Sequence, residues 1–250
     1  MALMEHRTGN YHFLPGIAPY SCGVVASPGH EIVHVTWQHP LPYRQGFDQV
    51  AALLDRLGRP RTALCSVSLR CPAPYSFRGF GEFNAEYEQL LRPWGVFVDG
   101  INPVARTNIA PLLAAPAEPV LYGFAFTRPG GAGQRPTFVV AGAGELPEGF
   151  LERSAIVALG DTSPDGLATK ARFVMQLMTD RLRGLGCDWS EVSTANVYTA
   201  HPVDRIVPDE VLRVMGSAAI HGVRWHASRP PVEEIEFEMD VRGTRTEWSL

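Results

Sequence analysis

The sequence is poor in several features that would place it in a specialised class. Its 250 residues include four cysteines and a single lysine, Lys170. No apolar run approaches the roughly 20 residues that span a bilayer, and the N-terminal residues lack the apolar core of a signal peptide. The net charge is −4, and no basic block could follow a phosphate backbone. These absences predict a cytoplasmic protein that binds neither membranes nor nucleic acids.

The cysteines and the lysine also limit the available chemistry. Cys22, Cys65, Cys71 and Cys187 form no C-x-x-C pair and are too sparse for a disulfide framework. They are therefore expected to be buried thiols. Schiff-base chemistry is possible at Lys170 alone.

What the sequence does contain is the material for a large core. It is 45% hydrophobic and 10% aromatic, which fits one large globular domain or two modest ones. Apolar periodicity predicts helices over 46–57, 80–91, 169–185 and 208–215, and strands over 63–69, 120–127, 137–143, 191–198 and 235–241. Helices that alternate with strands in this way favour an α+β fold, a mixed sheet covered on one face by helices.

A Gly/Pro-rich stretch at 128–136 separates two segments with a similar order of elements. We therefore expect a tandem of two related halves, residues 1–133 and 134–250. Identity between the halves is too low to establish the duplication from sequence.

His30-Glu31-Ile32-Val33-His34 matches the H-E-x-x-H pattern of zinc hydrolases. The match requires a helix, whereas the β-branched residues here alternate with polar ones, as in a strand. Residues four apart in a strand are separated by roughly 13 Å, too far to share a metal ion. We therefore expect no metal at these histidines and no cofactor.

Polar residues gather at the ends of the predicted elements. Tyr20 lies in the apolar turn IAPYSCGV, Asn84 in the helix FNAEYEQLL, and Arg106 and Thr107 in the segment ARTN. Near the C-terminus, Glu236 and Glu238 alternate with apolar residues, which predicts that both carboxylates share one face of a strand.

In their order along the chain, these segments resemble the YjgF-like (Rid) family of imine and enamine deaminases. VAGAGELPEG and PPVEEIEFEMDV resemble a conserved turn and the terminal strand of that family. The resemblance covers most of both halves and implies tandem YjgF-like domains with a chorismate-mutase-like α+β fold. It also implies assembly as a homo-oligomer, a trimer, with clefts between subunits.

The resemblance implies roles for individual residues in a metal-independent hydrolase. Arg106 would bind a substrate carboxylate, with Tyr20, Asn84 and Thr107 lining the pocket, and Glu236 would activate water. In the second half the matching turn places His221 at the arginine position unless the loop is shortened, in which case Arg224 takes it. Arg224 would then act in catalysis. His221, His226 and Tyr198 become further candidates for the site.

Three functions follow from these expectations. The first is hydrolysis of a small carboxylate-bearing imine, enamine or related C–N bond. The second is chorismatase-like hydrolysis of an enol ether, because chorismatases resemble a tandem of this kind. The third is a non-catalytic module of the same fold that binds a small ligand, since fold alone does not determine function.

Overall fold

The computed structural model describes residues 2–130 and 135–250. Within these ranges, twelve strands form one mixed sheet and four α-helices pack against it. The strands are β1 (Met4–His6), β2 (Tyr11–Leu14), β3 (Gly23–Ala26), β4 (His30–Pro42), β5 (Leu64–Arg70), β6 (Ala105–Pro111), β7 (Val120–Pro129), β8 (Phe138–Gly144), β9 (Thr194–Thr199), β10 (Arg224–Arg229), β11 (Glu238–Gly243) and β12 (Thr246–Ser249). The helices are α1 (Tyr43–Arg56), α2 (Phe77–Leu91), α3 (Pro164–Gly184) and α4 (Arg213–Met215).

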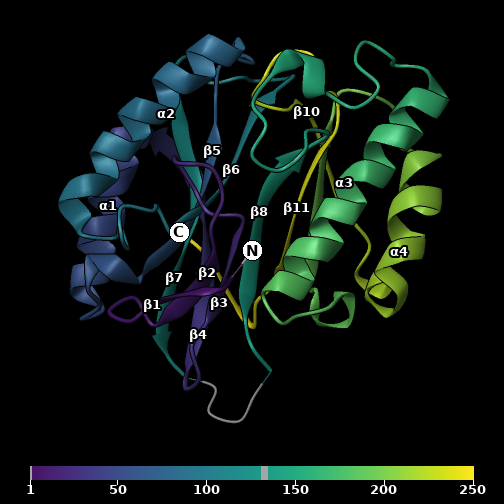
Figure 1. Ribbon diagram of the computed structural model, residues 1–250. Helices are drawn as coiled ribbons and strands as arrows, with labels where there is room; N and C mark the ends of the chain where they lie inside the picture. The colour runs from purple at the N-terminus through teal and green to yellow at the C-terminus, as the bar shows by residue number, and fades with distance from the viewer. Residues whose placement is uncertain (1, 131–134) are drawn as a thin grey trace.

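The elements form layers, with α1 and α2 on one side, α3 and α4 on the other, and the strands between them (Figure 1). Side chains alternate across β8, as strand geometry requires. Phe138 and Val140 pack in the core beneath α3, while Val139 and Ala141 join a second core between the two halves. Each half of the sheet is therefore covered by helices on one face, as expected, and by the other half on the opposite face.

The strand pairing repeats in the two halves. In the first, β6 pairs parallel with β5, β5 antiparallel with β7, and β7 antiparallel with β4. In the second, β10, β9, β11 and β8 pair in the same order and with the same directions. This repetition is consistent with a tandem arrangement. The expected boundary at residue 133 falls outside the described residues.

The predicted helices and strands are present, but three segments differ from the expectation. The strand expected over 235–241 begins only at Glu238. Residues 208–215 do not form one regular helix, since a π-helical turn at Val207–Leu212 precedes α4. The segment ARTN is not a turn but the first part of β6, because it pairs in parallel with β5. The turn comes earlier, where Asp99 and Gly100 both have positive φ.

The motif HEIVH lies in β4, which confirms the strand predicted for His30 and His34. No helix among the described residues is long and apolar enough to cross a membrane.

The strands β6 and β10 hold corresponding places in the two halves and pair with each other antiparallel at one end, yet they differ sharply in burial. Every residue of β6 is buried except the last, whereas most of β10 is exposed, including Trp225 at 48%. The strand β6 is covered because β8 of the second half and the loop before β3 lie against it: Ser21 donates its backbone N–H to Val104 O at 3.1 Å. The two halves meet at a seam where β6 lies against β8, and they also pair directly where the end of β6 meets the end of β10.

Candidate active site

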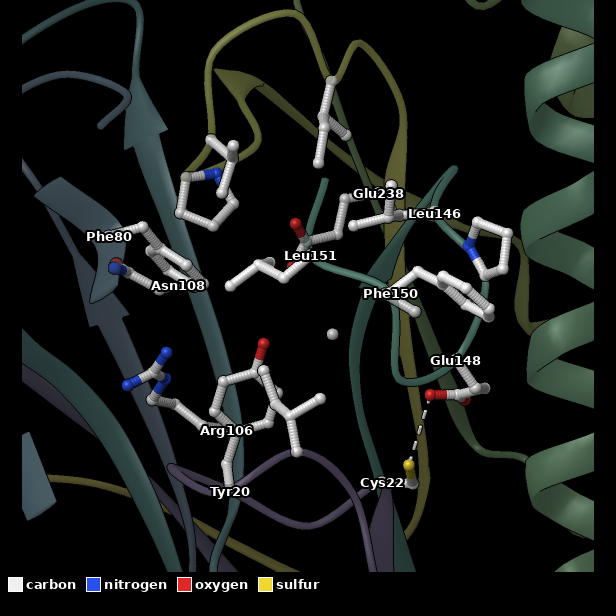
Figure 2. A pocket seen from close by; sticks show the side chains of 18 of the residues that line it. Tyr20, Cys22, Phe80, Arg106, Asn108, Leu146, Glu148, Phe150, Leu151 and Glu238 are labelled. Carbon is white, nitrogen blue, oxygen red and sulfur yellow. Dashed lines mark hydrogen bonds between the residues drawn. The ribbon is translucent and has the colours of Figure 1, made fainter. Parts of the chain in front are cut away.

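A cavity of about 90 Å³ opens at the seam between the halves. One wall comes from β6 and the loop before β3, and the opposite wall from the end of β8, the start of β11 and the segment 146–151. Figure 2 shows Arg106 and Asn108 on one side, Glu148 and Cys22 on the other, and Glu238 between the two walls. The cavity therefore combines side chains from both halves.

Arg106 is held beneath the cavity by α2 and an aromatic cage. Its Nη2 donates to Asn84 Oδ1 at 2.6 Å, and its guanidinium lies 4.3 Å from the ring centroid of Tyr20 and 4.7 Å from that of Tyr87. The residue is 3% exposed, and Nη1 has no hydrogen-bond partner among the described residues. A buried charged donor without a partner is costly, so Arg106 is prepared to bind an anion. The structure thus brings together Arg106, Asn84 and Tyr20, three of the residues that the sequence analysis named.

Asn108 follows Arg106 by two residues on β6, so both side chains point to the same face of the strand. The side-chain amide is buried, and neither Oδ1 nor Nδ2 has a partner within the described part of the chain. It offers a donor and an acceptor to whatever occupies the cavity.

Glu238, the first residue of β11, supplies the acid of the cavity. It is 5% exposed. Burial raises the pKa of its carboxyl well above the usual range, and the nearby Asp240 charge raises it further, against the opposing influence of Arg181 and Arg106. Burial therefore favours the protonated, neutral form of this carboxyl, which can donate a proton.

The opposite wall holds an ion pair. Arg181 Nε donates to Glu148 Oε1 at 2.7 Å, and Nη1 donates to Ala141 O at 2.9 Å. Burial alone would raise the pKa of Glu148, but the charge and hydrogen bonds of Arg181 outweigh it and hold the pKa below its usual value. The Cys22 thiol donates to Glu148 Oε2 at 3.5 Å, and burial raises its pKa to about 11. Cys22 is therefore a thiol, not a nucleophilic thiolate.

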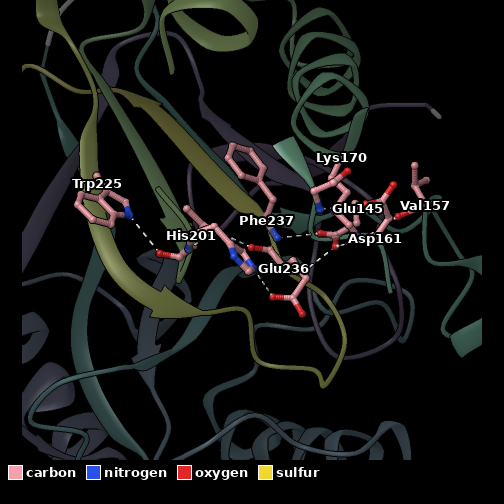
Figure 3. Close-up of polar contacts among 10 residues, drawn as sticks. Glu145, Val157, Asp161, Lys170, His201, Trp225, Glu236 and Phe237 are labelled. Atoms are coloured by element: carbon pink, nitrogen blue, oxygen red, sulfur yellow. Dashed lines mark hydrogen bonds and ion pairs between the residues drawn. The ribbon is translucent and has the colours of Figure 1, made fainter. Parts of the chain in front are cut away.

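Glu236 lies outside this cavity, although the sequence placed it on the same face as Glu238. The strand β11 begins at Glu238, and Glu236 precedes it. Its carboxylate accepts from His201 Nε2 at 2.8 Å (Figure 3).

Glu145 fixes the backbone immediately before β11. Its carboxylate accepts the backbone N–H groups of Glu236 at 2.7 Å and Phe237 at 3.0 Å, and pairs with the fully buried Lys170 at 3.0 Å (Figure 3). The lone lysine of the chain is thus part of a buried ion pair that fixes where β11 begins.

The remaining predicted site residues lie elsewhere. Thr107, Tyr198 and Arg224 line a second cavity between the halves. Arg224 faces that cavity and not the helix layer, so it does not take the place of Arg106 in its own half. His221 is exposed at the end of a helical turn, Gly216–His221. Sequence reasoning named Glu238 with Glu236 but gave the catalytic role to Glu236, and it did not select Asn108, Glu148 or Arg181, which complete the cavity.

The described residues contain no group of three or more His, Cys, Asp or Glu side chains that could hold a metal ion. The cavity instead combines a neutral acid, a guanidinium with a free N–H and an unpaired amide. Such a set can bind a carboxylate and donate a proton to a neighbouring atom of the same ligand.

The chorismatase fold supports the architecture described above. A chorismatase crystal structure superposes with a TM-score of 0.55 at 14% identity, covering 89% of this chain and 77% of the chorismatase. The YjgF gene product of E. coli matches 44% of this chain and 80% of its own length, with a TM-score of 0.30 at 12% identity.

Comparison of sequences identifies the family. The 2-amino-5-chloromuconate deaminase of Comamonas testosteroni is 39% identical over 244 residues, 97% of this chain and 96% of the relative. The family model described as 2-aminomuconate deaminase CnbZ matches residues 3–248. That family is distinct from the YjgF-like family that the sequence motifs resemble. The chain belongs to the CnbZ family of 2-aminomuconate deaminases.

Proposed function

We propose that the protein is a deaminase that hydrolyses the C–N bond of an unsaturated 2-amino dicarboxylate of the 2-aminomuconate type. The observation that carries this proposal is Glu238, a buried neutral acid in one cavity with the carboxylate-binding donors Arg106 and Asn108. The names of the family and of its relative from Comamonas testosteroni support the same class of substrate.

Two guanidinium groups in the cavity favour a dicarboxylate over a monocarboxylate. Arg106 and Asn108 would bind one carboxylate from the β6 wall. Arg181 on the far wall would attract the other, although Glu148 already engages its Nε. A planar guanidinium suits a planar carboxylate better than an ammonium does.

The reaction begins as proton transfer to carbon. In a 2-amino diene the nitrogen lone pair donates electron density to the carbon chain. The Glu238 carboxylic acid protonates a carbon of that chain, which leaves an iminium at C2. Water then adds to C2 and gives its proton to the Glu238 carboxylate. Proton transfer to the amine nitrogen and loss of ammonia leave a 2-oxo dicarboxylate. One water enters and one ammonia leaves, and Glu238 ends the cycle protonated.

Access to the site requires movement of the segment 146–151. A volume of about 90 Å³ has room for a handful of water molecules, less than a six-carbon dicarboxylate needs. The segment lines the cavity, and its Phe150 is 58% exposed, so it is the wall least held by packing.

The test is solvent-deuterium labelling with 2-aminomuconate generated in place. The wild type should release ammonia and form a 2-oxo product that carries deuterium on carbon. Glu238→Gln should lose both signals, whereas Glu236→Gln should keep them. Ammonia release without carbon deuteration would overturn the role of Glu238, and no release above buffer would overturn the deaminase assignment.

The enol-ether alternative uses the same first step, because an enol ether is also protonated on carbon before water adds. The chorismatase superposition supports the shared fold alone. Turnover of chorismate but not of 2-aminomuconate would favour it. Binding of either ligand without turnover would favour a non-catalytic module.

We also infer that copies of this chain associate through the exposed face of β10, as tandem YjgF-like domains would. Within the chain, the corresponding strand β6 is covered by the other half, whereas β10 leaves Trp225 48% and nearby Ile220 87% exposed. A second copy would bury these side chains. Sedimentation should show a trimer or another closed oligomer, and a monodisperse 27 kDa species would contradict the inference.

A further inference from the structure

A second cavity, of about 70 Å³, lies between the two halves of the sheet, apart from the site of Arg106. Thr107 lines it, whereas its neighbour Arg106 points to the helix side of β6. Strand side chains from both halves form the walls, including Arg70 from β5 and Tyr198 from β9. The proposed deaminase reaction uses none of these groups directly.

Arg70 is the main cation of this cavity. It is 7% exposed, and its guanidinium lies 3.9 Å from the ring centroid of Tyr122. Nη1 donates to Leu69 O at 2.8 Å. Among the residues that the structure describes, Nε and Nη2 of Arg70 have no hydrogen-bond partner. Stacking on the tyrosine fixes the plane of the guanidinium and leaves the edge formed by Nε and Nη2 available to donate.

The acceptors near Arg70 are already used. Asp240 accepts from Thr107 Oγ1 at 2.7 Å, Tyr198 OH at 2.9 Å and Asn196 Nδ2 at 2.7 Å. Arg242, also on the cavity wall, donates to Glu247 at 2.9 Å. Within the described part of the chain, neither of these carboxylates accepts a hydrogen bond from Arg70.

The other polar groups add donors. The hydroxyls of Ser66 and Ser68 face the cavity and make no side-chain hydrogen bond to other described residues. Arg70, Arg224 and Arg242 bring three positive charges against the two carboxylates of Asp240 and Glu247. The cavity is therefore rich in donors and cationic overall, which favours an anion over a neutral or cationic ligand.

We propose that this inter-sheet cavity binds a small oxyanion, a phosphate or a short carboxylate, in contact with the free edge of Arg70. A planar guanidinium edge matches two oxygens of either group, and Ser66 and Ser68 supply further donors. The volume has room for about five water molecules, so it fits an oxyanion of that size and excludes a six-carbon dicarboxylate.

Calorimetric titration of the full chain tests the site, with inorganic phosphate and oxalate as separate probes at low ionic strength. The wild type should bind at least one probe, and the stronger one identifies the oxyanion class. Arg70→Gln should weaken binding roughly ten- to a hundredfold, the loss expected for charged hydrogen bonds. Arg183→Gln, which removes a 72% exposed guanidinium, is the matched control and should leave binding unchanged.

Two further variants keep the test decisive. If Arg70→Gln does not fold, the double variant Ser66→Ala, Ser68→Ala should still weaken binding. Arg106→Lys should leave intact the binding component that Arg70→Gln weakens, because Arg106 belongs to the other cavity. Absence of binding to the wild type overturns the proposal, and so does binding that is lost in Arg106→Lys but kept in the Arg70 and serine variants.

Discussion

The strands β6 and β10 hold corresponding places in the two halves, yet their chemistry differs. Arg106 on β6 pairs with Val67 and faces the helix layer, where aromatic rings and Asn84 surround it. The helix-facing position of β10 holds Trp225, which pairs with Val197 and is half exposed. A shared strand order therefore does not bring a shared site. The site forms where a strand is covered by the other half, since burial is what raises the pKa of Glu238 and leaves Arg106 with an unpaired donor.

The largest expected effect is a difference in kcat between variants of Glu238, which begins β11, and of Glu236, which precedes it. Glu238→Gln keeps the shape of the side chain but cannot protonate carbon, so kcat for 2-aminomuconate should fall by about 10²–10⁴. Glu236→Gln should change kcat by less than about threefold, because Glu236 pairs with His201 outside the cavity. Steady-state kinetics of both variants measure the contrast, and equal losses would contradict the assignment.

The next effect is on stability, and it concerns the buried ion pair of Lys170 and Glu145 that fixes where β11 begins. Lys170→Met leaves the Glu145 carboxylate buried without its cation and should lower the free energy of unfolding by about 3–5 kcal/mol. The surface pair of Arg172 and Glu210 is the control, and Arg172→Gln should cost at most about 1 kcal/mol. Urea denaturation measures both. A loss below 1 kcal/mol for Lys170→Met would show that the buried pair is not what fixes where β11 begins.

Matched arginine substitutions compare the strands β6 and β10 directly. Arg106→Lys keeps the charge but loses the planar contact, so KM should rise roughly ten- to a hundredfold. Arg224→Lys on β10 should leave kcat and KM near wild type, because Arg224 faces the other cavity. If Arg224→Lys impairs turnover as much as Arg106→Lys, both strands contribute to the site, and its assignment to β6 and not β10 is contradicted.

The smallest effect is on pH dependence. The raised pKa of Glu238 means that the folded state keeps a proton that the unfolded state releases, so stability falls as pH rises from the unfolded pKa towards the folded one. The slope from one group is at most about 1.4 kcal/mol per pH unit. Glu238→Gln removes this penalty. Its Tm relative to wild type should therefore increase as pH rises through that window, and kcat of the wild type should fall above the folded pKa. A pH-independent difference in Tm would contradict the shift.

Much of the fold could be predicted from the sequence because apolar periodicity is strong in the buried elements. The strand that contains His30 and His34 and the helix that contains Met175 and Met178 both follow from their patterns. The register of β11 could not be predicted in the same way. Alternation places Glu236 and Glu238 on one face only if the strand begins before both, and the contacts of Glu145 that delay it join residues about 90 positions apart.

Two of the missed site residues did leave a signal. Arg181 lies three positions after Met178, on the buried face of the predicted helix, where a charge needs a partner. Asn108 stands two positions after Arg106, which places both on one face once the segment is known to be a strand. Glu148 lies in a loop without periodicity, so only the folded chain shows that it faces Arg181.

The covalent link between the halves has an evolutionary consequence. If the same interface formed between identical copies of a shorter chain, every substitution would appear in each copy of that interface. A change that improved one interface would therefore alter all of them. In this chain the residues of β6 and β10 are encoded separately. One strand can keep an arginine at its helix-facing position while the other has a tryptophan there, and selection can act on each without disturbing its counterpart.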